Sequence, residues 1–178
     1  MPPRSILVIT GASGSGKTAI VAALAAQAAP GVRYHHFDAV GVPDPRAMTA
    51  QYGSPEGWQV AVCHQWITRL ATDPTDSILD VLEGQVRPGT VQEAFQRHQV
   101  HRGRILLLDC SPGAREARLV GPRNQPELAT TRMTAWAAYL RGQADALHVP
   151  ALDTTDLSLP EAVERVRQHV TALAVAED

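Results

Sequence analysis

The sequence predicts an α/β fold in which helices cover both faces of a parallel sheet. Short apolar, β-branched segments alternate along the chain with longer segments of helical periodicity. Gly, Pro or an acidic residue stands where most of these segments end, as is typical of turns. The segment Arg104–Leu108 (RILLL) is almost continuously apolar, which indicates a strand buried on both faces. Together these observations favour strands and helices alternating around one parallel sheet.

In the first part of the chain, a strand, a helix and a second strand follow one another. Ser5–Thr10 (SILVIT) is apolar and β-branched and ends at a glycine, so it predicts a buried strand. Lys17–Ala29 carries alanine and larger apolar residues at helical spacing, and a Pro-Gly pair ends it. Val32–Phe37 predicts the second strand, and the Gly- and Pro-rich segment Gly41–Pro45 predicts a loop.

The middle of the chain repeats the alternation. An amphipathic helix is predicted over Glu56–Ala71, and an Asp-Pro pair after it ends the helical pattern. Ser77–Leu82 (SILDVL) predicts the third strand and Arg104–Leu108 the fourth. Val91–His101, between them, predicts a helix.

The last third adds three helices and one strand. A short helix is predicted over Pro112–Leu119, followed by a loop over Val120–Pro126. Glu127–Leu147 predicts one long helix, because a proline stands at its first turn. His148–Leu152 predicts the last strand, and the capping-box pattern Ser158-Leu159-Pro160-Glu161 opens a final helix that runs to about Ala174.

Length and composition predict one cytoplasmic domain over residues 1–178. The chain of 178 residues has a formal net charge of -2 and no run of basic residues, which argues against a nucleic-acid partner. No apolar stretch reaches the length of a membrane span or a signal peptide. The two cysteines, Cys63 and Cys110, have no metal-ligand spacing and are interpreted as reduced thiols.

A phosphate-binding loop follows the first predicted strand. The motif G-x-x-x-x-G-K-[ST] is met at every position by Gly11, Ala12, Ser13, Gly14, Ser15, Gly16, Lys17 and Thr18. Glycines let the backbone curl and turn its N–H groups inward, and the following helix directs its N-terminal dipole at the same point. Lys17 can reach the β- and γ-phosphates, and the Thr18 hydroxyl can bind Mg²⁺. The loop therefore predicts binding of a nucleoside triphosphate with magnesium.

The motif and the arrangement of elements resemble the P-loop small-molecule kinases of the nucleoside-monophosphate-kinase-like group. That group includes shikimate, gluconate and adenylate kinases and chloramphenicol phosphotransferase. The resemblance implies a three-layer P-loop NTPase fold whose five-stranded parallel sheet has the order 2-3-1-4-5, with helices on both faces. It implies ATP and Mg²⁺ as cofactors and transfer of the γ-phosphoryl group to a hydroxyl of a small-molecule acceptor. It also implies an acceptor-binding region at about 38–75 and a short lid at about 115–126.

Acidic residues stand at the ends of predicted strands, where open parallel sheets bind their ligands. Asp38 ends the second strand, and in kinases of this kind an acid there takes the proton of the acceptor hydroxyl. Glu83 ends the third strand, in a strand-Glu-Gly segment similar to that of uridine-kinase-like proteins, and is the predicted magnesium-linked acid. Asp80 competes for this role, but it lies inside the strand, where an unpaired charge is costly to bury. Asp38 also fits a helix cap or an ordinary loop acid.

Arginines lie in and beside the predicted lid. The family's lid arginines clamp the transferring phosphoryl group, because a guanidinium is planar, always charged and bidentate. Arg118 and Arg123 are the candidates here, ahead of Arg115, although three arginines this close also fit a solvated helix face. Asp109 ends the fourth strand, and the resemblance places the loop Asp153–Thr155 against the adenine ring.

Further residues carry weaker hypotheses. Gln85 and Arg87 follow Glu83 and can hold polar or anionic groups of the acceptor, or form an ordinary exposed loop. Arg46 can meet an anionic acceptor. His98 and His101 stand three apart on one predicted helix, and a metal there is the lesser interpretation.

Two other functions remain open at this point. A nucleotide-binding regulatory ATPase module would share the phosphate loop but would need no proton-accepting acid. A kinase acting on the end of a nucleic acid would lose binding steeply with salt. A Ras-type GTPase is disfavoured because the sequence lacks Asn-Lys-x-Asp. The acceptor, the choice between ATP and GTP, and the oligomeric state are not predicted.

Overall fold

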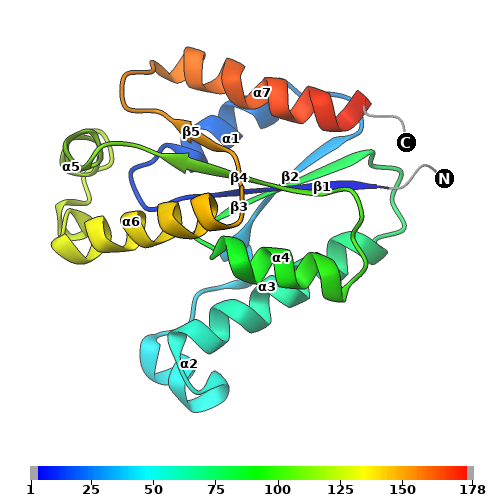
Figure 1. The fold of residues 1–178 in the computed structure, drawn as a ribbon, viewed down its shortest axis with the longest axis horizontal. Coiled ribbons are helices and arrows are strands. Elements are labelled where there is room, and N and C mark those ends of the chain that lie inside the picture. Colours follow the sequence, from blue (N-terminus) through cyan, green and yellow to red (C-terminus); the bar gives the residue numbers. More distant parts are fainter. Residues whose placement is uncertain (1–3, 176–178) are drawn as a thin grey trace.

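Five parallel strands form one sheet in the computed structural model, which describes residues 4–175 (Figure 1). The strand order is β2-β3-β1-β4-β5, and every paired neighbour runs parallel. This confirms the predicted fold class and order. The strands are β1 (Ser5–Thr10), β2 (Val32–His36), β3 (Leu79–Gly84), β4 (Gly103–Asp109) and β5 (Ala151–Asp153).

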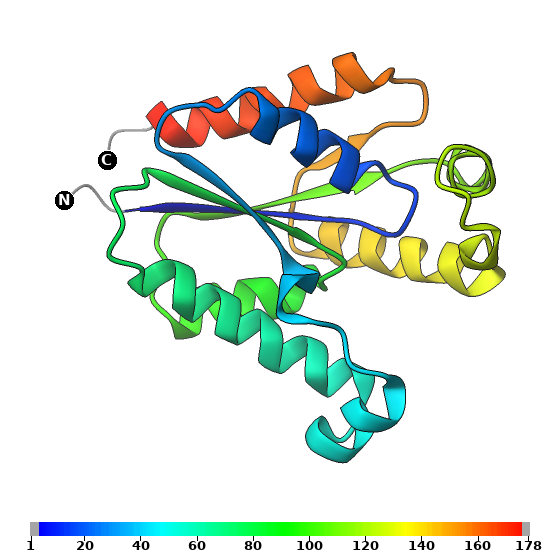
Figure 2. The same ribbon diagram turned by 180° about the vertical axis from the view of Figure 1, so that it is seen from behind.

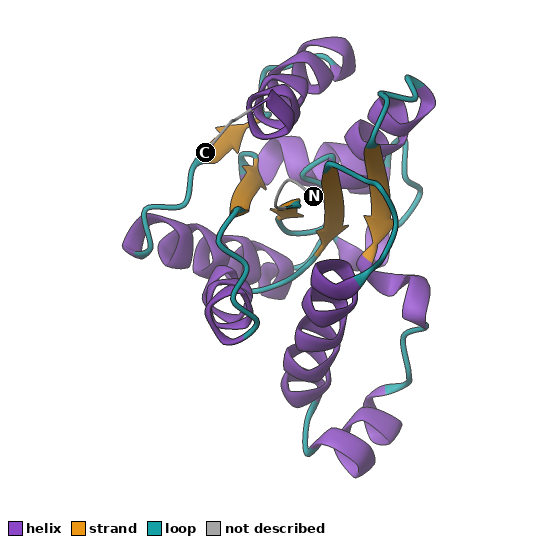
Figure 3. Cartoon of the chain, turned by 90° about the vertical axis from the view of Figure 1, so that its right-hand side faces the viewer, coloured by secondary structure: helices purple, strands orange, loops and turns teal. Residues whose placement is uncertain are grey.

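Helices cover both faces of the sheet, as the end-on view shows (Figure 3). Side chains alternate along β1, so Leu7 and Ile9 pack in one apolar cluster while Ile6 and Val8 pack in the other. The first cluster contains residues of α1 (Lys17–Ala26) and α7 (Leu159–Val175), and the second contains residues of α3 (Pro55–Thr72) and α4 (Pro88–Arg97). A third cluster packs α6 (Thr131–Ala146) against β4.

Several element boundaries differ from the expectations, among them β5, which was predicted over 148–152, and α4, which was predicted over 91–101. The helix predicted over 127–147 is instead a 3₁₀ turn, η2 (Pro126–Leu128), followed by α6, because the Thr130 side chain accepts a hydrogen bond from the Met133 N–H and starts a new helix. The segment after the loop at 41–45 forms α2 (Pro45–Tyr52), capped by Asp44. Strand β3 runs two residues further than predicted, to Gly84. Within residues 4–175, no helix has the length and apolar character needed to cross a membrane.

The α2–α3 hairpin extends away from the sheet on the side of α3 and α4 (Figure 2). Gly41, which ends the short helix before this arm, and Gly53, between α2 and α3, have φ values of 86° and 79°. Such positive φ values are adopted at little cost by glycine alone. Glycine therefore allows the turns before and after α2, while Met48 of α2 and the apolar face of α3 pack in the cluster below the sheet.

A polar network surrounds Asp80 near the amino ends of β2 and β3. The Asp80 carboxylate is fully buried and accepts hydrogen bonds from Arg33 Nε at 2.8 Å and Arg33 NH2 at 3.1 Å. His35 Nε2 lies 2.8 Å from the same carboxylate, the Ser77 hydroxyl donates to it at 3.1 Å, and Arg4 Nε lies at 3.5 Å. The buried charge of Asp80 is thus compensated by these partners. Because Arg33 and His35 belong to β2, Asp80 holds this edge strand on the sheet.

Replacing Asp80 with alanine is expected to lower the free energy of unfolding by about 3–5 kcal/mol, since it leaves buried cationic donors without their acceptor. Urea-induced unfolding followed by circular dichroism measures this loss. The matched control is Asp76→Ala, an exposed acid four residues earlier, whose effect is expected to stay within about 0.5 kcal/mol. Equal effects of the two substitutions would contradict the structural role of Asp80.

The same carboxylate makes stability depend on pH. Burial alone raises the pKa of Asp80, but the hydrogen bonds from His35 and Arg33 outweigh it and hold the pKa below its usual value. A lowered folded-state pKa contributes stability that is complete above the unfolded value of about 3.9 and is lost as pH falls through the folded value. We expect the stability difference between the wild type and Asp80→Asn to shrink below about pH 4 in urea titrations, whereas a constant difference would refute the assignment.

Candidate active site

The loop between β1 and α1 has the backbone geometry that the phosphate-loop motif requires. Gly11 has a φ of 152°, and a Cβ atom there would lie 2.2 Å from the Leu108 carbonyl oxygen. Gly14 has a φ of 83°, and a Cβ atom there would lie 2.8 Å from Arg115 Cγ. Because β4 and α5 (Pro112–Val120) press on the loop from outside, only glycine fits at these positions. The loop is closed tightly enough to turn its N–H groups toward a bound anion.

Lys17 is a buried cation at the start of α1. Its side chain is in the core at 6 % exposure of the residue, and its ammonium donates to the Ala12 carbonyl at 3.2 Å. Burial lowers the pKa of Lys17 to about 8, while the charges of Glu83 and Asp38 act in the opposite direction. Burial of the ammonium costs free energy that its carbonyl contact only partly offsets. An anionic ligand such as a phosphate group would compensate this charge.

Two carboxylates lie at the carboxyl ends of β2 and β3, within electrostatic reach of Lys17. Glu83 is buried, and its Oε1 lies 3.5 Å from the Thr18 hydroxyl and 2.7 Å from His36 Nδ1. Asp38 lies in the short helix η1 (Phe37–Val40). Partial burial raises the pKa of Asp38, and the neighbouring Glu83 charge raises it further. Both predicted acids are therefore brought to the loop, and His36 is a partner of Glu83 that the sequence did not single out.

The residues at this point fit a magnesium ion. Mg²⁺ keeps most of its waters and takes one or two oxygen ligands from a kinase, the rest coming from substrate phosphates. Thr18 and Glu83 offer a hydroxyl and a carboxylate side by side. Asp80 does not compete, because its oxygens are engaged by Arg33 and His35. Among residues 4–175 no three His, Cys, Asp or Glu side chains gather as an all-protein metal site would need.

The three lid arginines lie in different settings. Arg115 is buried at 3 % exposure beneath Gly14 and donates to Asp109 Oδ1 at 3.1 Å and the Cys110 carbonyl at 2.8 Å. Arg118 donates to the Gly14 carbonyl at 3.3 Å and to the Thr154 hydroxyl at 2.9 Å, so it is fixed against the outer side of the loop.

Arg123 is exposed, and its charge lowers the pKa of Lys17. Of the three, Arg123 is the side chain that is free to approach a phosphoryl group without breaking a hydrogen bond in residues 4–175.

A cavity of about 560 Å³ adjoins the loop on the side of α1 and α7. Its wall carries the Arg118 side chain, the apolar faces of α1 and α7, and Thr154 from the loop after β5. The Thr154 hydroxyl lies 3.1 Å from the Ser15 carbonyl and its N–H donates to the Asp109 carbonyl at 2.8 Å. The mostly apolar wall suits a nucleobase, and Thr154 is the residue of the loop Asp153–Thr155 that lines it.

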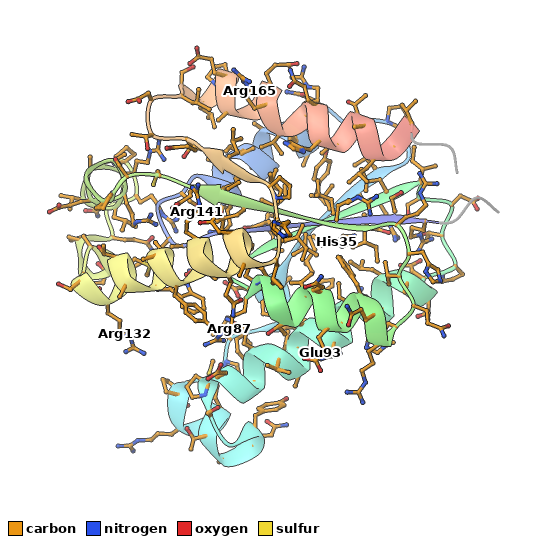
Figure 4. All side chains as sticks on the ribbon, viewed as in Figure 1. His35, Arg87, Glu93, Arg132, Arg141 and Arg165 are labelled. Atoms are coloured by element: carbon orange, nitrogen blue, oxygen red, sulfur yellow. The ribbon has the colours of Figure 1, made fainter. Side chains whose placement is uncertain are left out.

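A second cavity, of about 730 Å³, lies between α3 and α6. Figure 4 shows Arg87 and Arg132 on the side of α6 that faces the α2–α3 arm, and both line the cavity. Gln85 connects this cavity to the loop: its amide donates to the Ser13 hydroxyl at 2.8 Å and accepts from Trp136 Nε1 at 3.2 Å. Sequence reasoning missed Trp136, since a helical tryptophan reads equally well as core packing.

Two sequence hypotheses have ordinary structural partners. Asp109 pairs with Arg115 at 3.1 Å and lies 3.8 Å from Arg141, so it braces α5 and α6 against the end of β4. The helix α4 ends at Arg97, so His98 and His101 do not share a helix face as predicted. His98 Nε2 lies 3.2 Å from His64 Nδ1 on α3, and burial lowers the pKa of His64.

Comparison with known proteins identifies the fold. No family model and no curated protein matches the sequence. Among solved structures, shikimate kinase from Acinetobacter baumannii in complex with shikimate is 17 % identical, with a TM-score of 0.61 over 97 % of this chain and 96 % of that one. A gluconokinase from Sinorhizobium meliloti 1021 is 17 % identical, with a TM-score of 0.62 over 98 % and 95 %. Thymidylate kinase from Candida albicans is 10 % identical, with a TM-score of 0.64 over 99 % and 96 %. At these identities the likeness establishes a P-loop kinase-like fold.

Proposed function

We propose, on the basis of this shared fold, that the protein is an ATP-dependent kinase that moves the γ-phosphoryl group to a hydroxyl of a small-molecule acceptor. The observation that carries the proposal is the convergence of four groups at the carboxyl ends of β1, β2 and β3. Lys17 and Thr18 are neighbours at the start of α1, Glu83 comes from β3 to lie beside Thr18, and Asp38 comes from η1 to within electrostatic reach of Lys17. A module that only bound nucleotide would need no proton-accepting acid, so the behaviour of Asp38 separates the two functions.

Each residue has a role that follows from its position. The loop amides of Gly11–Thr18 and Lys17 hold the β- and γ-phosphate oxygens of ATP, and Arg118 and Thr154 border the base. Thr18 and Glu83 would hold magnesium, which would shield the phosphate charge. Arg123, with Arg118 anchoring the outer side of the loop, covers the γ-phosphoryl group and limits access of water.

The transfer itself is a substitution at phosphorus. The bond between the γ-phosphorus and the β,γ-bridging oxygen breaks, a bond from the acceptor oxygen to the γ-phosphorus forms, and ADP leaves. The acceptor's hydroxyl proton passes to the Asp38 carboxylate. The raised pKa of Asp38 supports this role, because a more basic carboxylate accepts a proton more readily.

The test is transfer of label from γ-labelled ATP, with Mg²⁺, into a broad panel of small hydroxyl compounds. The proposal expects one class of compounds to become labelled, and the labelling to be strongly slowed by Lys17→Ala or Asp38→Asn. Binding of ATP without labelling of any compound would overturn the kinase and favour a nucleotide-binding regulatory module. Transfer to the end of an oligonucleotide alone would assign a nucleic-acid acceptor instead.

A further inference from the structure

The cavity between α3 and α6 contains a guanidinium that the protein holds rigidly. The Arg87 side chain is 18 % exposed, although it stands in a loop directly after β3. Its NH1 donates to Gln59 Oε1 at 2.7 Å. Its guanidinium carbon lies 4.9 Å from the Trp136 ring centre and 5.9 Å from that of Tyr139. A cation fixed on three sides loses little conformational entropy when a ligand binds it.

The protein leaves part of this guanidinium without a strong partner. Its NH2 lies 3.3 Å from Glu56 Oε1, but the Glu56 side chain is 62 % exposed. A pair with one such exposed member contributes little free energy, so a ligand can replace Glu56. Arg87 Nε is buried and has no hydrogen-bond partner among residues 4–175. The residues around Arg87 therefore orient the side chain without saturating its donors.

The aromatic side chains of the cavity support the cation rather than offer a stacking surface. Trp136 and Tyr139 lie one turn apart on α6 and stack on each other, with ring centres 5.6 Å apart and an interplanar angle of 19°. Arg87 lies over both rings. An acceptor recognised mainly through a flat ring, such as an uncharged nucleoside, would have to compete with this guanidinium for the same faces.

A hydrogen-bonded side chain connects the cavity to the phosphate loop. Gln85 bridges Ser13 of the phosphate loop and Trp136 of the cavity wall, and the Gln85 carbonyl accepts from Gln59 at 2.7 Å. A molecule in the cavity is thus one side chain away from the phosphate loop. Arg132, exposed at the first turn of α6, adds a second positive charge to the rim.

We propose that the acceptor is a hydroxyl compound carrying an oxyanion, either a carboxylate or a phosphate monoester, and that Arg87 binds this oxyanion. The inference rests on the kinase function proposed above. A guanidinium matches both oxyanions because it donates two parallel hydrogen bonds to two oxygens of one group. Arg87 is a specificity-determining residue in this assignment, and the reacting atoms lie at Lys17 and Asp38.

The first experiment uses the wild-type chain and pairs of compounds that differ only in charge. Hydroxy acids are compared with their primary amides, and sugar phosphates with their parent sugars, as acceptors of label from γ-labelled ATP. We expect kcat/KM for the charged member to exceed that of the uncharged member by roughly 10- to 100-fold, the scale of a hydrogen bond to a charged group. The carboxylate and phosphate arms show which oxyanion is used.

The second experiment changes the guanidinium. Arg87→Gln should raise KM for the charged acceptor roughly 10- to 100-fold and remove most of the preference over its uncharged partner, while ATP affinity in calorimetry stays unchanged. Arg87→Lys keeps the charge but loses the planar guanidinium. Its KM for the charged acceptor should lie between those of the wild type and Arg87→Gln. The matched control is Arg69→Gln, because Arg69 also lies over a tryptophan, Trp66 at 5.3 Å, but outside the cavity.

The outcomes separate the two proposals. Equal use of charged and uncharged acceptors by the wild type would overturn the role of Arg87 and leave the kinase standing. An unchanged preference of folded Arg87→Gln for the charged acceptor would also overturn the role of Arg87 without affecting the kinase proposal. No transfer to any compound, charged or uncharged, would overturn the kinase and this inference with it.

Discussion

Replacing Asp38 with asparagine should slow phosphoryl transfer by about 10²- to 10⁴-fold, the contribution typical of a positioned general base. The amide is nearly the same size as the carboxylate but does not accept a proton at neutral pH. Affinity for ATP should stay close to that of the wild type, because Asp38 is not part of the phosphate loop or of the cavity beside α1 and α7. Steady-state transfer and isothermal titration calorimetry measure the two quantities on the same preparation.

A matched control lies six residues along the chain. Asp44 is exposed and caps α2 by accepting hydrogen bonds from the N–H groups of Arg46 and Ala47. Asparagine caps helices about as well as aspartate does, so Asp44→Asn removes a nearby negative charge and keeps the fold. Turnover in Asp44→Asn should be near normal. Near-normal turnover in Asp38→Asn as well would show that no carboxylate in this segment takes the proton.

Replacing Lys17 with alanine should lower turnover at least ~100-fold, on the scale of losing one charge contact to the transition state. The ammonium is the buried positive charge of the loop itself and donates to the Ala12 carbonyl, so its loss leaves the γ-phosphoryl charge uncompensated there. Stability should not fall, because removing a buried, weakly compensated charge relieves a desolvation cost. Turnover and the urea midpoint together distinguish lost chemistry from lost folding.

The control for charge is Arg167→Ala. Arg167 is exposed on α7 and pairs with Glu164 one turn away, so its removal subtracts a positive charge far from the loop. This variant should transfer label at the normal rate. Transfer by Lys17→Ala at a rate close to that of Arg167→Ala would rule out the mechanism.

The strands follow from the sequence because most are short, apolar and followed by Gly, Pro or an acidic residue, whereas their order was predicted from the resemblance to P-loop kinases. The phosphate loop can also be predicted from the sequence, because its residue spacing and its place between β1 and α1 are both local features. The predicted helix boundaries differ from the structure where two helix-start signals stand close together in the sequence. Pro126 is typical of a helix start, yet Thr130 caps a second start four residues later, and the helix begins there. The helix α2 was not predicted because Asp44, which caps it, lies in the Gly- and Pro-rich segment that was predicted to be a loop.

Most of the candidate site depends on contacts between distant segments, which a single sequence does not contain. Asp80 looked costly inside β3 because its partners Arg33 and Arg4 come from other segments. Likewise, nothing near Arg87 in the sequence indicates that Trp136 and Gln59 will hold it. The roles of Asp38, Glu83, Arg118 and Arg123 stay predictions that the variants above test.

The single buried ammonium at the phosphate loop has a practical consequence for chemical labelling. Lys17 is the only lysine in the sequence. An amine-directed acylating reagent therefore has one side-chain target, which is the group that contacts the nucleotide phosphates in the proposed mechanism. Mass spectrometry of the intact protein would count that modification without background from other lysines, with the terminal amine resolved by peptide digestion. Protection by ATP, or by an acceptor analogue with ADP, would turn the extent of acylation into an occupancy assay that needs no knowledge of the acceptor.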